Sequence, residues 1–96
     1  MSAKQSHKGL AGVDFRTLND EGVRLRLAGR YDEAEATLRL AANASDHHYP
    51  HNGLGNLYLE LGHLAEAEEA YREALRRSPD YNPSRTGLAL VLLALG

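Results

Sequence analysis

The stretch that decides the fold is residues 48–81, with the sequence HYPHNGLGNLYLELGHLAEAEEAYREALRRSPDY. Leucine, alanine, glutamate and arginine dominate it, and all four favour helices. Gly62 divides the stretch, so we expect one helix over residues 50–61, with Pro50 in its first turn, and another over about 64–77. Two helices joined by a short glycine turn form an antiparallel hairpin.

The same arrangement recurs along the chain. Residues 33 positions apart match repeatedly, and a spacing of 34 connects the second unit to the last helix. Many matches at one period across two junctions are typical of a repeat architecture. The matched pairs are Gly22 and Gly55, Gly29 and Gly62, Ala34 and Ala67, Ala41 and Ala74, Asn19 and Asn52, Glu33 and Glu66, Glu35 and Glu68, Arg39 and Arg72, then Leu54 and Leu88, Tyr58 and Leu92, Leu61 and Leu95, and Gly62 and Gly96.

The rest of the chain is also predicted to be helical. No segment has the alternating pattern of a half-buried strand, and β-branched residues are scarce. Residues 1–13 have little apolar content and are interpreted as a mobile tail, and residues 45–49 as a turn. Further helices are expected at residues 14–28, at 31–44 and, behind an Asn82 cap, at 83–95.

These hairpins are expected to share one core. A chain of 96 residues fits a single domain. One hairpin cannot bury its apolar face alone, whereas a second hairpin stacked on it completes a core, as in a solenoid. Small residues should lie where the two helices of a hairpin approach, with Gly22 facing Ala34 and Gly55 facing Ala67.

The second unit also carries a spaced set of residues, namely Leu54-Gly55, Tyr58, Gly62, Ala67, Tyr71, Ala74 and Pro79. This spacing resembles that of a tetratricopeptide repeat, or TPR. His51 departs from the pattern because it stands where that repeat has tryptophan. By this resemblance, residues 14–47 are a degenerate first repeat, 48–81 a second repeat, and 82–96 the first helix of a third.

The resemblance implies an all-α, TPR-like fold, a right-handed superhelical α-solenoid of antiparallel helix hairpins. It also implies a function in protein–protein interaction, in which the first helix of each hairpin lines a concave groove that binds an extended peptide or a partner's helix. Asparagine suits such a groove, because its amide both donates and accepts hydrogen bonds. The groove positions carried over are Arg16, Asn19, Val23, Arg26, Tyr49, Asn52, Asn56, Leu59, Glu60 and Thr86, with Leu90 and Leu93 on the last helix.

One sub-family of TPR proteins is argued against. Chaperone-binding TPR domains hold a C-terminal carboxylate with lysine, arginine and asparagine, and such a clamp needs charge-assisted donors. No cation stands at the corresponding positions, which carry Asn19, Val23, Gly53, Pro83 and Gly87.

Composition and motifs argue against other classes of function. Eleven basic against thirteen acidic residues give a net charge of −2, which does not indicate nucleic-acid binding. Cysteine is absent, no catalytic constellation is visible, and no cofactor is expected. His47 and His51 have a helical metal-site spacing, but Pro50 lies between them and only Asp46 adds a carboxylate, so no metal site is predicted. We therefore expect a protein that is not an enzyme.

The last helix is apolar on almost every side. A helix of this kind should be buried all round, yet this chain offers it only one covering neighbour. Either the chain is a fragment of a longer protein, or the helix buries itself against a second copy. We predict a homodimer through this helix, with self-association residues Leu88, Leu90, Val91, Leu93 and Leu95.

Three readings of the function remain open. The first is a scaffold that binds an unknown protein or peptide partner. The second is a self-assembly module, and the third is an accessory domain cut from a larger regulator or enzyme. The longest apolar run, residues 88–95, is far too short to cross a membrane, and no signal peptide is seen. A cytoplasmic location is the default expectation.

Overall fold

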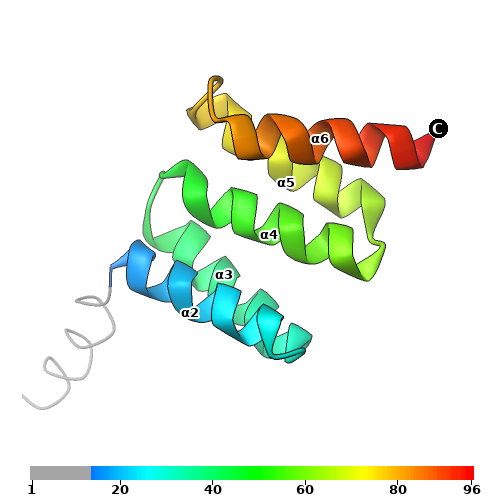
Figure 1. The fold of residues 1–96 in the computed structure, drawn as a ribbon. Coiled ribbons are helices and arrows are strands. Elements are labelled where there is room, and N and C mark those ends of the chain that lie inside the picture. The colour runs from blue at the N-terminus through cyan, green and yellow to red at the C-terminus, as the bar shows by residue number, and fades with distance from the viewer. Residues whose placement is uncertain (1–13) are drawn as a thin grey trace, which may run out of the picture.

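The computed structural model describes residues 14–96, so the tail predicted for residues 1–13 lies outside the described residues. The described part is a stack of five helices with no strand (Figure 1). It confirms an all-α solenoid built of helix hairpins. The helices are α2 (Phe15–Leu27), α3 (Tyr31–Ala44), α4 (His48–Leu61), α5 (Leu64–Arg77) and α6 (Asn82–Leu95).

The helices form two layers. The first helices of the hairpins, α2, α4 and α6, lie in one layer, and the second helices, α3 and α5, lie behind them (Figure 1). We call the outer surface of α2, α4 and α6 the first-helix face. None of the helices within residues 14–96 combines the length and apolarity needed to cross a bilayer.

Local chemistry sets the helix ends. Asp14 caps α2, because its carboxylate accepts the amide N–H of Thr17 at 3.0 Å. Gly29 and Gly62 take φ values of 80° and 78°, a left-handed conformation that glycine adopts without steric cost. Both glycines therefore end the first helix of a hairpin and turn the chain back.

Two predicted helix starts were late. Helix α4 begins at His48, two residues before Pro50, because His47 acts as its N-cap through an Nδ1 that accepts the Tyr49 N–H at 3.2 Å. Helix α6 begins at Asn82 itself, so Asn82 is the first helical residue and the N-cap is Tyr81. Neither shift changes the repeat spacing.

The nearest neighbours of Gly22 and Gly55 are large side chains and not the predicted alanines. A Cβ added at Gly22 would lie 2.5 Å from Leu38, and one added at Gly55 would lie 2.6 Å from Tyr71. The alanines at positions 34 and 67 are buried, but the partner of each glycine is the large residue one helical turn later. The glycines thus make room for the largest side chain of the hairpin.

Each of those large residues also touches the next repeat. A Cβ at Gly53 would lie 3.0 Å from Leu38, and one at Gly87 would lie 2.3 Å from Tyr71. Leu38 and Tyr71 are both fully buried, so each fills the gap between two successive first helices. Leu38 and Tyr71, 33 residues apart in the sequence, thus each pack one hairpin against the first helix of the next repeat.

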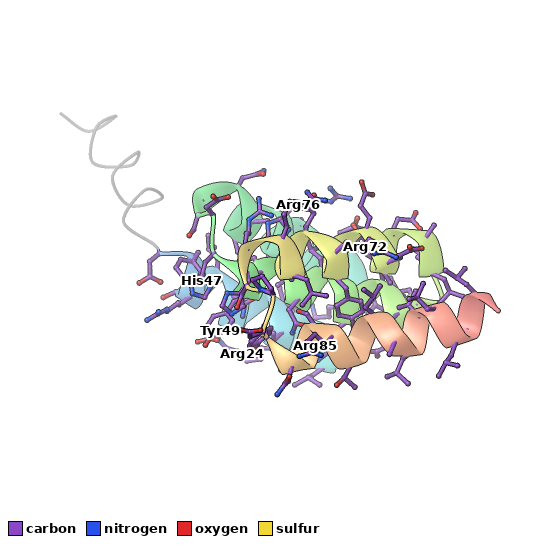
Figure 2. All side chains as sticks on the ribbon, turned by 90° about the horizontal axis from the view of Figure 1, so that it is seen from above. Arg24, His47, Tyr49, Arg72, Arg76 and Arg85 are labelled. Carbon is purple, nitrogen blue, oxygen red and sulfur yellow. The ribbon has the colours of Figure 1, made fainter. Side chains whose placement is uncertain are left out.

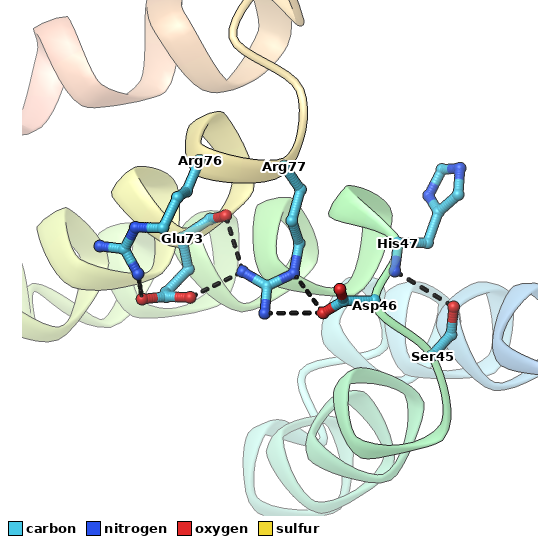
Figure 3. Close-up of polar contacts among 6 residues, drawn as sticks. All are labelled: Ser45, Asp46, His47, Glu73, Arg76 and Arg77. Carbon is cyan, nitrogen blue, oxygen red and sulfur yellow. Dashed lines mark hydrogen bonds and ion pairs between the residues drawn. The ribbon is translucent and has the colours of Figure 1, made fainter.

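Polar contacts add to the stacking. The Tyr58 hydroxyl on α4 donates to Glu35 on α3 at 2.6 Å and accepts from Arg39 at 2.7 Å. Burial and the contact with Glu35 raise the pKa of Tyr58 to about 12, so this hydroxyl stays protonated. At the end of α5, Arg77 binds Asp46 in the inter-repeat turn at 3.0 Å (Figure 3). Asp46 is largely exposed, so that ion pair contributes little to stability.

Ion pairs line the outer surface of α5. Glu68 pairs with Arg72 at 2.9 Å and Glu73 with Arg77 at 2.6 Å, and Glu73 also binds Arg76 (Figure 3). The spacing of three or four residues places these side chains on one side of the helix. These ion pairs face solvent and stabilise α5.

Candidate functional site

The predicted groove residues all lie on α2, α4 and α6. Because the three first helices occupy equivalent places in successive repeats, residues at equal repeat positions form rows across the first-helix face. Arg16, Tyr49, Glu60 and Thr86 are exposed, and the other predicted residues on α2 and α4 are half-buried. The rows are Arg16, Tyr49 and Pro83, then Asn19, Asn52 and Thr86, then Val23, Asn56 and Leu90, and finally Arg26, Leu59 and Leu93.

Two groove asparagines are held by hydroxyl groups from neighbouring helices. Asn52 accepts a hydrogen bond from Ser84 of α6 at 2.8 Å, and Asn56 accepts one from Tyr71 of α5 at 2.5 Å. Burial raises the pKa of Tyr71 to about 12, so its hydroxyl remains a donor. Each amide oxygen is therefore occupied within the chain, and the amide NH2 group is what each asparagine can offer to a ligand.

The third asparagine has a different environment. The Oδ1 atom of Asn19 is buried and has no hydrogen-bond partner among residues 14–96. It lies close to Gly53 of the neighbouring first helix, where an added Cβ would be 3.0 Å away. Asn19 is thus packed against α4 rather than held by a hydroxyl, and only Asn52 and Asn56 share the fixed arrangement.

Arg26 and Glu60 are engaged with each other. The Arg26 guanidinium donates to Glu60 at 2.8 Å and the Tyr31 hydroxyl donates to the second Glu60 oxygen at 2.8 Å. These contacts with Arg26 and then Tyr31 lower the pKa of Glu60, which stays ionised. The ion pair joins α2 to α4 at one end of the first-helix face. Only the polar atoms of Arg26 and Glu60 that are not used in this ion pair can bind a ligand.

Ser84 and Tyr71 were not among the predicted site residues. Ser84 is fully buried, yet in the sequence it looks like an ordinary serine at a helix start, where capping explains it. In the sequence, Tyr71 stands out only as a member of the repeat pattern. Its second role could be found only from the contact with Asn56, because no local sequence signal marks it.

Five aromatic rings gather where α2, α4 and α6 begin. His47 lies 4.6 Å from Phe15 and 4.3 Å from His48 between ring centroids, and His48 lies 4.3 Å from Tyr81. Tyr49 completes the cluster and keeps about a third of its surface exposed; Figure 2 shows it beside His47 at one end of the molecule. The rings pack the three helix starts together and border the first-helix face.

The environments of His48 and His51 predict a dependence of stability on pH. Burial and, secondarily, His47 lower the pKa of His48, and burial lowers the pKa of His51. The unfolded chain therefore binds more protons than the folded one just below the ordinary histidine pKa of about 6.5, and stability is lost as the pH falls through that window. We expect the thermal midpoint to drop between about pH 7.5 and 5.5.

A variant without His48 and His51 checks the origin of that drop. The double substitution His48→Gln and His51→Gln should flatten the stability curve over the same window, as measured by thermal unfolding at a series of pH values. A midpoint that rises on acidification, or a double variant with an unchanged slope, would contradict this assignment. Glu35, Glu60 and Glu73, whose pKa values are lowered by their partners, should lose their contributions only below about pH 4.5.

The residues predicted for self-association do not form one surface. Val91 is fully buried in the core of the chain, so its assignment to an interface was wrong, and Leu88 is half-buried against the same core. α6 turns these two residues toward α4 and α5. The exposed residues are Leu90, Leu93 and Leu95, together with Leu92, which was not among the predicted residues.

No group of three or more metal-ligating side chains is found among residues 14–96. Of the histidines near the inter-repeat turn, His47 and His48 stack on each other, and His47 is the N-cap of α4.

Family comparison agrees with the repeat geometry. Two tetratricopeptide repeat models match the chain, one at residues 48–81 and one at residues 16–39. The chain belongs to the TPR family. TPR repeats are a non-catalytic scaffold fold that generally mediates protein–protein interaction.

The TPR region is also similar to part of a mouse protein named O-mannosyl-transferase TMTC2. The two are 33% identical over 72 residues, which is 71% of this chain but only 9% of the relative. The chain therefore spans a small fraction of that protein's length. No solved structure matches the chain significantly.

Proposed function

We propose that this TPR chain is a protein-interaction module that binds an extended peptide or a helix of a partner protein on its first-helix face. The observation that carries the proposal is the pair Asn52 and Asn56, whose oxygens are held by Ser84 and Tyr71. A side chain with a fixed orientation loses little freedom on binding, which favours affinity.

The spacing of the pair suits a peptide backbone. Residues four apart on a helix are separated by about 6 Å along its axis. Carbonyl groups that face the same way in an extended peptide recur every second residue, about 6.6 Å apart. Two NH2 donors on α4 can thus serve two such carbonyls of one ligand.

The apolar residues beside the asparagines add side-chain selectivity. Leu90 and Leu93 on α6 are 51% and 78% exposed, and they occupy the rows of Asn56 and Leu59. A partner held by the asparagines would meet these leucines on one side. We therefore expect a ligand with apolar side chains where it passes α6.

Selection from a random-peptide display library tests the proposal. Peptides enriched on this chain should bind it with micromolar affinity in fluorescence polarisation and should carry apolar residues. A folded helical hairpin protein of similar charge serves as the control target. If no sequence is enriched above that control, the proposal fails.

We also propose that the chain acts as an interaction module rather than as an enzyme. The name of the mouse relative describes a transferase, but the similarity covers the repeat region and 9% of that protein. A TPR segment in such a protein would serve to bind or position other chains. A cytoplasmic location stays a prediction.

Self-association through α6 is the second candidate function. Its support is the exposure of four leucines on one helix, at 51%, 43%, 78% and 50% for residues 90, 92, 93 and 95. Exposed large apolar side chains gathered on one helix are typical of an interaction site. By the repeat spacing, Leu92 and Leu95 correspond to Tyr58 and Leu61 on α4, which pack within the core of their own hairpin.

Light scattering with matched variants tests this candidate. The chain should be a dimer at tens of micromolar, and the pair Leu90→Glu and Leu93→Glu should make it a monomer. The pair Leu92→Glu and Leu95→Glu changes the other side of α6, the side that corresponds to Tyr58 and Leu61 on α4. Comparing the two double variants shows which side of α6 forms the dimer. A parent chain that is already monomeric would refute the dimer.

A further inference from the structure

A pocket of about 330 Å³ opens on the opposite side of the molecule, between the second helices α3 and α5. We call it the outer pocket. Its floor is formed by α4, through Leu54 and Tyr58, and its walls include Ala42 of α3 and Ala70 of α5. It shares no residue with the proposed peptide-binding rows, so an inference about it is independent of the function proposed above.

The space has an identifiable origin in the sequence. His51 lines the pocket and stands where the repeat motif has tryptophan, a considerably larger side chain. Its Nε2 atom is buried without a hydrogen-bond partner among residues 14–96. The two small alanines on the walls keep α3 and α5 from filling the gap, which leaves a pocket with an apolar and aromatic floor.

The rim of the pocket is negatively charged overall. Glu66 and Glu69 line it, and neither forms an ion pair or a side-chain hydrogen bond within residues 14–96. Arg39 lines it too, but its guanidinium is paired with Glu35 at 2.9 Å and donates to the Tyr58 hydroxyl. The charge of Arg39 is thus balanced by Glu35. The carboxylates of Glu66 and Glu69 have no cationic partner within residues 14–96 and can pair with a cationic ligand.

We propose that the outer pocket binds an arginine side chain of a partner protein. The aliphatic stem would lie on the floor beside Leu54 and the alanines, and the guanidinium would meet Glu66 and Glu69 at the rim. Arginine fits better than lysine, because its planar, weakly hydrated guanidinium can donate to two carboxylates at once.

An NMR titration with a matched pair of small probes tests this assignment. N-acetyl-arginine amide should shift the backbone amides of Asn43, His51 and Glu69, with a dissociation constant of the order of 1 mM for so small a ligand. N-acetyl-citrulline amide has nearly the same shape without the charge, and it should produce no such shifts. Equal binding of the citrulline probe, or of N-acetyl-lysine amide, would overturn the assignment to arginine.

Two variants separate the charge from the space. Glu66→Gln with Glu69→Gln should weaken the arginine probe about tenfold, whereas the charge-matched control Asp32→Asn with Asp80→Asn should leave binding unchanged. His51→Trp should fill the pocket and remove the shifts while circular dichroism still reports a folded helical protein. Undiminished binding in the glutamine pair and in the folded His51→Trp variant would overturn the proposal.

Discussion

Tyr71→Ala should destabilise the chain by about 3–5 kcal/mol, a large share of the 5–15 kcal/mol that holds a domain together. Tyr71 is fully buried and fills the gap between two first helices at Gly55 and Gly87. Because those positions have no side chains of their own, nothing nearby can occupy the space that the ring leaves. The cavity would therefore loosen α4, α5 and α6 together. Urea unfolding followed by circular dichroism measures this loss.

Tyr71→Phe provides the matched control. It keeps the ring between the glycines and removes only the hydroxyl that donates to Asn56, so we expect a cost of about 1 kcal/mol. If Tyr71→Ala were no more costly than Tyr71→Phe, the ring would not be the element that joins the second hairpin to α6, and this account of the stacking would be wrong.

Asn52→Asp together with Asn56→Asp should weaken a display-selected peptide about 100-fold, because two hydrogen-bond donors are lost and carboxylates face the peptide carbonyls. The substitution keeps an acceptor oxygen for Ser84 and Tyr71, so the fold should be retained. Fluorescence polarisation gives the affinity, and thermal unfolding checks that the variant is folded.

A control of equal charge isolates the role of the two amides. Asn43→Asp with Asn82→Asp adds the same two negative charges at exposed positions on α3 and at the start of α6. Its affinity for the peptide should change by less than about threefold. Similar losses in both double variants would mean that net charge, and not the pair on α4, controls binding.

Repeat spacing was sufficient to predict the helix order and the solenoid, because glycines at the turns and matched residues at 33 and 34 positions leave few alternatives. Local ends were harder. The start of α4 depends on a histidine N-cap, and histidine is not a common cap, so Pro50 suggested a later start.

The candidate site was only partly predictable for a physical reason. Positions such as Asn52 and Asn56 follow from the repeat, but their orientation depends on Ser84 and Tyr71, which reach them from other helices. Val91 was misassigned because a helix that is apolar on all sides gives no sign of which side faces its own core. The outer pocket requires three helices to be placed, and only His51 hinted at it.

The most direct test of the central claim is to map a display-selected peptide onto this chain by NMR chemical shifts. We expect the largest changes on the side-chain NH2 groups of Asn52 and Asn56, with further changes at Leu90. Changes confined to α3 and α5, with both asparagine NH2 groups unaffected, would contradict the claim that the first-helix face is the binding surface.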